Sequence, residues 1–142
     1  MTKKISSYLE LYNHAYDTMD WDKLKEDPKK EQEAKDYLWE LSLKAAREDF
    51  GFFVRLFVTE LLPEYTHGRH VDVITDACQE LWDAIKTNNK EMDASKGYAP
   101  SKLQVAIPPE SSKTTICSHL FPAWVLGKDP KMRIMVICHG GD

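Results

Sequence analysis

Lys113 and Thr114 are the neighbouring pair in this sequence whose side chains are best suited to chemistry. They follow a short apolar run, residues 103–107, and precede an apolar segment with helical spacing. At the start of a helix, a lysine ammonium neutralises the β- and γ-phosphates of a nucleotide, and the hydroxyl group that follows it ligates Mg²⁺. Backbone N–H groups of the same turn and the helix dipole strengthen the attraction for an anion. These residues therefore have the layout of a phosphate-binding loop.

The usual motif of such loops, G-x-x-x-x-G-K-[ST], is only partly present. Its two glycines fall on Ile107 and Ser112. The spacing alone therefore favours a phosphate loop no more than a capped junction between a strand and a helix that carries an exposed lysine.

A more specific pattern spans the same eight residues. The large subunits of viral terminases, ATP-driven motors that pump genomic DNA into phage capsids, carry a deviant loop of the form x-P-P-R-x-G-K-[ST]. Residues 107–114 resemble it in length, in the Pro-Pro pair and in the Lys-Thr pair. Residues 121–130, FPAWVLGKDP, resemble the helix of that family that ends in W-V-L-G-x-x-P. Residues 46–55 and 65–70 resemble the segment that precedes the ATPase core.

The resemblance implies a fold, an activity and partners. The implied fold is α/β, a fragment of the P-loop NTPase type in which a helical N-terminal region precedes a β-α-β unit with parallel strands. The implied function is ATP hydrolysis with Mg²⁺, coupled to translocation of double-stranded viral DNA in the host cytoplasm. The implied partners are a portal protein, a small terminase subunit and a homo-oligomeric motor ring. We expect the 142 residues to be part of a longer enzyme. They lack the acidic strand that completes ATP hydrolysis and the nuclease domain, so we do not expect activity from this chain alone.

The resemblance also assigns roles within the loop. Lys113 would stabilise the charge of the transition state, and Thr114 would ligate Mg²⁺. Pro108 and Pro109 would stiffen the approach to the loop, because proline has a fixed φ and no N–H donor. The predicted binding residues are Pro108, Pro109, Glu110, Ser111, Ser112, Lys113, Thr114, Thr115 and His70.

Two residues depart from the family pattern. Glu110 stands where the family has an arginine that contacts the γ-phosphate, and a carboxylate there repels a phosphate by about 1 kcal/mol at 4 Å in water. Ser112 replaces the glycine before the lysine, at a cost of order 1 kcal/mol if its φ is positive. Both departures favour the alternative hypothesis, a truncated phage remnant that acts as a non-catalytic interaction module.

The surrounding elements must position this loop. We expect a helical region over residues 1–62, with helix starts at Ser7 and at Asp27-Pro28 because Ser and Asp cap free N–H groups. Residues 50–62 predict a buried helix. The incomplete ATPase core over residues 63–142 should contain two parallel strands, residues 103–107 and 133–138, joined by a helix over 115–126.

A further amphipathic helix is predicted before the loop, with one apolar stripe made of His70, Ile74, Cys78, Leu81 and Ile85. The family resemblance makes Tyr65, His67 and His70 candidates for lining an adenine pocket. His67-x-x-His70 lacks the companion motif of a metal site, so we interpret these residues as a turn histidine and a helix-start histidine.

Composition limits the remaining choices. The net charge is −4, with 14 basic and 20 acidic residues over 1–97 and 5 basic and 3 acidic residues over 98–142. This balance argues against a dedicated nucleic-acid-binding module. Cys78, Cys117 and Cys138 have no paired spacing, which indicates reduced core cysteines of a cytosolic protein. No apolar run has the length of a membrane span, so no membrane partner is predicted.

Overall fold

A computed structural model describes residues 7–61, 67–90, 102–108 and 112–137. The chain divides into two compact units, Met1–Tyr65 and Thr66–Asp142, which are described separately below. The sequence-based boundary between residues 62 and 63 lies close to this division.

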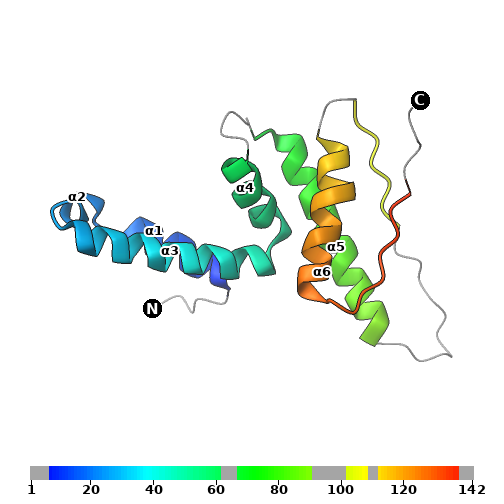
Figure 1. Ribbon diagram of the computed structural model, residues 1–142. Coiled ribbons are helices and arrows are strands. Elements are labelled where there is room, and N and C mark those ends of the chain that lie inside the picture. Colours follow the sequence, from blue (N-terminus) through cyan, green and yellow to red (C-terminus); the bar gives the residue numbers. More distant parts are fainter. Residues whose placement is uncertain (1–6, 62–66, 91–101, 109–111, 138–142) are drawn as a thin grey trace, which may run out of the picture. The chain divides into compact units, whose positions relative to one another are not determined.

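The described part of the first unit is helical (Figure 1). Its elements are α1 (Tyr8–Thr18), α2 (Trp21–Leu24), α3 (Pro28–Glu48) and α4 (Phe50–Leu61). The side-chain oxygens of Ser7, Asp20 and Asp27 accept hydrogen bonds from backbone N–H groups of the first turns of α1, α2 and α3. Pro28 occupies the start of α3, where a missing N–H costs nothing. The helix starts predicted at Ser7 and Asp27 are therefore confirmed.

The long helix α3 organises this unit because α1, α2 and α4 all pack on it. The carboxylate of Glu48, at the end of α3, accepts a hydrogen bond of 3.0 Å from the backbone N–H of Tyr8, at the start of α1. The two helices therefore run in opposite directions. The buried apolar side chains come from α3 and α4: Leu38, Leu41, Ala45, Ala46, Phe50, Val54 and Val58.

The second unit contains α5 (Arg69–Lys90) and a second helix. The second helix begins at Lys113 and continues through the π-helical segment η1 (Thr115–Leu120) and α6 (Phe121–Lys128). Three contacts join α5 to this second helix in the same order along both. Cys78 lies beside Cys117 in the lining of one cavity. The ring centroids of Trp82 and Trp124 are 5.9 Å apart, and the Lys86 ammonium lies 2.8 Å from the Asp129 carboxylate. The two helices therefore run side by side in the same direction (Figure 1).

Pro122 explains the widened turn of η1. A proline inside a helix has no N–H to donate and its ring crowds the carbonyl group four residues earlier, here that of Ser118. A π-turn before the proline relieves this crowding while the helix continues. The backbone N–H of Phe121 accordingly donates to the carbonyl of Ile116, five residues earlier.

The predicted α/β fold is wrong for the part of the chain that the structure describes. Neither residues 102–108 nor residues 132–137 form a strand, so no β-α-β unit of the P-loop NTPase type is present there. A parallel strand requires hydrogen-bonded neighbours and is normally covered on both faces. The apolar side chains of the second segment are instead exposed, 81% for Met135 and 85% for Ile137. Residue 138 of the second predicted strand lies outside the described residues.

In the described residues, none of the helices combines the length and the apolar composition needed to cross a lipid bilayer.

The ion pair of Lys86 and Asp129 makes the stability of the second unit depend on pH. The Asp129 carboxylate accepts a hydrogen bond from the Lys86 ammonium and another from the backbone N–H of Lys131. Both hydrogen bonds hold the pKa of the Asp129 carboxyl below its usual value. The carboxylate therefore contributes stability above the ordinary Asp pKa of about 4. That contribution is lost as the pH falls through the lowered pKa.

We predict that Asp129→Asn lowers the midpoint of thermal unfolding at pH 7 and that the difference from wild type disappears in strong acid. Thermal denaturation followed by circular dichroism across a pH series measures this. Asp22→Asn is the matched control because Asp22 pairs with Lys25 at a fully solvated surface, where such pairs contribute little. An Asp129→Asn difference that persists unchanged below pH 3 would contradict the linkage.

Candidate functional site

Ser112 has a left-handed backbone conformation directly before Lys113. Its φ is 57°, and it is the one residue other than glycine with a positive φ in the described ranges. Non-glycine residues adopt this region at a cost of about 1–2 kcal/mol. The carbonyl oxygen of Ser112 also accepts the first hydrogen bond of the helix, 2.9 Å from the N–H of Ile116. The left-handed residue therefore directs the chain into the helix that begins at Lys113.

Three backbone N–H groups lie at this helix start. Those of Lys113, Thr114 and Thr115 precede the first helical hydrogen bond, so the helix geometry leaves them directed out of its end. The Lys113 side chain is half-buried, whereas Thr114 and Thr115 are exposed. A positive side chain, a hydroxyl group and the positive end of a helix dipole thus occur together, which is an arrangement suited to an anion.

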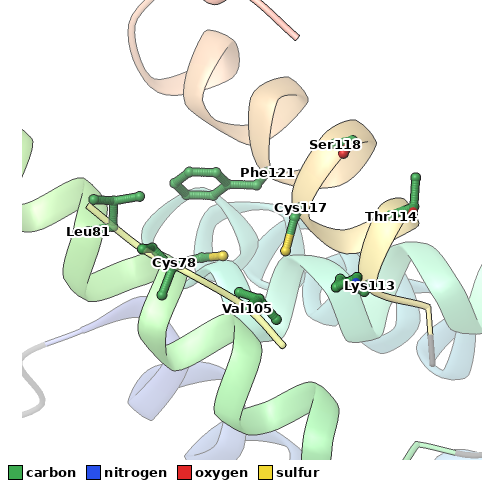
Figure 2. Close-up of a pocket in the computed structure, with 9 residues that line it drawn as sticks. Cys78, Leu81, Val105, Lys113, Thr114, Cys117, Ser118 and Phe121 are labelled. Carbon is green, nitrogen blue, oxygen red and sulfur yellow. The ribbon is translucent and has the colours of Figure 1, made fainter. Parts of the chain in front are cut away.

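The helix start borders a cavity of about 360 Å³ between α5, the segment 102–108 and the second helix (Figure 2). The residues that line it are Cys78, Leu81, Leu103, Val105, Lys113, Thr114, Cys117, Ser118 and Phe121. Lys113 is the one charged residue among these nine. The cavity thus has the volume of a small-ligand site. Its lining is mostly apolar and also contains the Lys113 ammonium and the hydroxyl groups of Thr114 and Ser118.

Two thiols, those of Cys78 and Cys117, line this cavity. Burial raises the pKa of the Cys78 thiol to about 12, and its neighbour Cys117 adds to the effect. Burial also raises the pKa of Cys117, although a hydrogen bond from Cys78 and the nearby Lys113 ammonium oppose this rise. Both thiols are therefore protonated at neutral pH.

The structure brings only some of the predicted site residues together. Ser112 directly precedes Lys113 and Thr114, which line the cavity, while Pro108 is exposed at the end of a described segment. Thr115 is exposed and does not line the cavity. The other predicted loop residues, Pro109, Glu110 and Ser111, lie outside the described residues.

The predicted adenine-pocket residues lie at the start of α5. His70 is exposed in the first turn, its ring lies against Gly68, and it does not line the cavity. The His67 ring is 2.7 Å from the Asp72 carboxylate. Tyr65 lies outside the described residues. The contact between His67 and Asp72 gives His67 a local role at the helix start.

No group of three or more His, Cys, Asp or Glu side chains within the described ranges is arranged to hold a metal ion.

Sequence reasoning missed the cavity-lining face of the second helix. Cys117 and Phe121 lie four and eight residues after Lys113, and both contribute to the cavity wall. The helical spacing of these three residues was the available signal. The patterns at residues 107–114 and 121–130 lie at the two ends of this helix and do not indicate which face lines a cavity.

Comparison with family models, with curated proteins and with solved structures finds no match to this chain.

Two serine substitutions test the backbone at the helix start. We predict that Ser112→Gly raises the free energy of unfolding by about 1 kcal/mol, because glycine adopts a positive φ without a steric penalty. Ser118→Gly is the matched control. Ser118 lies inside the helix, so glycine there should lower the free energy of unfolding by about 0.5 kcal/mol. Urea unfolding of both variants measures the two effects, and effects of equal sign would contradict the left-handed conformation of Ser112.

Proposed function

We propose that the helix start at residues 112–115 binds the phosphate groups of ATP with Mg²⁺. The observation that supports this proposal most strongly is the left-handed Ser112 directly before Lys113. It replaces the glycine of the phosphate-loop motif and has the backbone conformation for which glycine is normally selected. A plain junction with a solvent-exposed lysine has no need for such a strained residue.

Each group at the helix start has a distinct task in this proposal. The Lys113 ammonium neutralises the β- and γ-phosphates as a mobile point charge, and the Thr114 hydroxyl ligates Mg²⁺. The N–H groups of Lys113, Thr114 and Thr115 donate to phosphate oxygens. Because the lysine is half-buried beside a mostly apolar cavity, its attraction for phosphate is screened less than that of a fully solvated lysine.

We further propose that this binding serves a phage DNA-packaging motor. The resemblance of residues 107–114 and 121–130 to large terminase subunits supports this assignment. In such a motor ATP hydrolysis drives double-stranded DNA into a capsid, with a portal protein, a small terminase subunit and sister motor subunits as partners in the host cytoplasm. The proposal concerns the loop and the helix that follows it, and it requires no parallel sheet within this chain.

A second candidate function is a non-catalytic interaction module. It is favoured by exposed apolar side chains on α3, where Trp39 is 49% and Leu43 is 44% exposed. These two residues are one helical turn apart and therefore share a face. Exposed aromatic side chains of this size are enriched where proteins bind one another.

Isothermal titration with MgATP tests the first candidate. We predict that Lys113→Ala weakens binding about 10- to 100-fold, because a hydrogen bond to a charged group contributes about 1.5–3 kcal/mol. Lys131→Ala is the matched control, since Lys131 is an exposed lysine beyond the far end of the same helix. Equal affinities for the wild type and the Lys113→Ala variant, or no binding by either, would exclude the nucleotide site and leave the interaction module.

A further inference from the structure

Cys78 and Cys117 are two free thiols that face each other across the interface of α5 and η1 (Figure 2). Their side chains point toward one another, and both line the same cavity. Neither residue has a role in the proposed phosphate site. A pair of adjacent thiols can exchange its two hydrogens for one covalent bond.

The neighbouring contacts hold this pair in register. The Trp82 and Trp124 rings meet edge to face one turn further along α5, and Lys86 bonds Asp129 one turn beyond that. The helices therefore cannot slide past one another without breaking both contacts. Cys78 and Cys117 remain adjacent wherever this packing persists.

The two thiols differ in access to a reagent. Both thiols line the cavity, but Cys78 is buried, with 1% of its surface exposed, whereas Cys117 is half-buried. Burial raises the pKa of the Cys117 thiol, and the Lys113 ammonium, one turn before it, opposes only part of this rise. We therefore expect Cys117 to react first with an external disulfide. Cys78 lies beside it and can then attack the resulting mixed disulfide.

We propose that Cys78 and Cys117 are an oxidative modification site that forms a reversible intrachain disulfide by exchange with a small disulfide such as oxidised glutathione. The Cys117 thiolate attacks one glutathione sulfur, forms a mixed disulfide and releases one glutathione thiolate. The Cys78 thiolate then attacks the Cys117 sulfur and displaces the second glutathione thiolate. The protein loses two electrons and two protons, and oxidised glutathione is reduced to two molecules of glutathione.

The disulfide would couple the redox state to the helix start. A covalent S–S bond is shorter than any contact between two free thiols, so it would draw η1 toward α5 and narrow the cavity that both residues line. Lys113 lies one turn from Cys117 and moves with it. This consequence, unlike the disulfide itself, rests on the proposed binding of MgATP.

The test uses the full chain with Cys138→Ser, so that Cys78 and Cys117 are its two remaining thiols. The protein is equilibrated with mixtures of reduced and oxidised glutathione and analysed by mass spectrometry after acid quenching. We expect loss of two hydrogens, one cross-linked peptide pair containing both cysteines, and full reversal by dithiothreitol. In the same background, Cys78→Ser should instead retain one glutathione on Cys117, while Cys117→Ser should react at least about 10-fold more slowly at Cys78.

Two results would overturn the site. One is a chain that keeps both thiols free in oxidised glutathione while a solvent-exposed cysteine in a control peptide reacts fully. The other is a chain that stops at the mixed disulfide although Cys78 is present. Circular dichroism of each variant confirms that the helices are intact. Each cysteine is replaced in a separate variant. If one variant misfolds, the other still tests the pair.

Titration of the reduced and the oxidised protein with MgATP then separates the two proposals. We expect oxidation to weaken binding at least about 5-fold, the lower end of typical coupling between two sites. If the disulfide forms but the affinity for MgATP does not change, the modification site stands and its coupling to the helix start is wrong. If the disulfide forms in a protein that binds no MgATP, the modification site stands and the proposed function is wrong.

Discussion

The indole rings of Trp82 and Trp124 hold α5 against the helix that begins at Lys113. Both side chains are buried, at 3% exposure each, and the Lys86–Asp129 pair closes the same interface at its far end. This packing decides where the helix starts relative to α5. The cavity beside Lys113 and the approach of the two thiols both depend on it. Deleting either indole would create a cavity in the centre of this interface, at a cost of about 3–5 kcal/mol.

The helix start combines one favourable and one unfavourable departure from the usual phosphate loop. Ser112 stands at the position of the motif's second glycine and has a left-handed φ. The packing of the helix that follows must offset the steric cost of this conformation. Glu110 places a carboxylate in the loop where the terminase pattern has an arginine. Two like charges repel more strongly at a partly buried site than in water, so the proposed binding of MgATP requires that this carboxylate stay away from the phosphates.

Sequence reasoning succeeded where structure is set by local hydrogen bonds. The helix starts at Ser7 and Asp27 follow from side-chain oxygens that bond N–H groups two or three residues away. The strand prediction for residues 103–107 was wrong because an apolar, β-branched run becomes a strand only when a neighbour supplies hydrogen bonds. The left-handed φ at residue 112 was foreseeable from its position in the motif. The π-turn before Pro122 was not, since the same proline is compatible with a helix break.

In the proposed site, the N–H groups at the start of this helix bind phosphate. Titration of the ¹⁵N-labelled protein with MgATP, followed by amide chemical shifts, tests this contact residue by residue. We predict saturable shifts of the Lys113, Thr114 and Thr115 amides, with those of Lys128 and Lys131 at the opposite end of the helix unchanged. A titration that leaves the first three amides unmoved, or that moves all five alike, would contradict the claim.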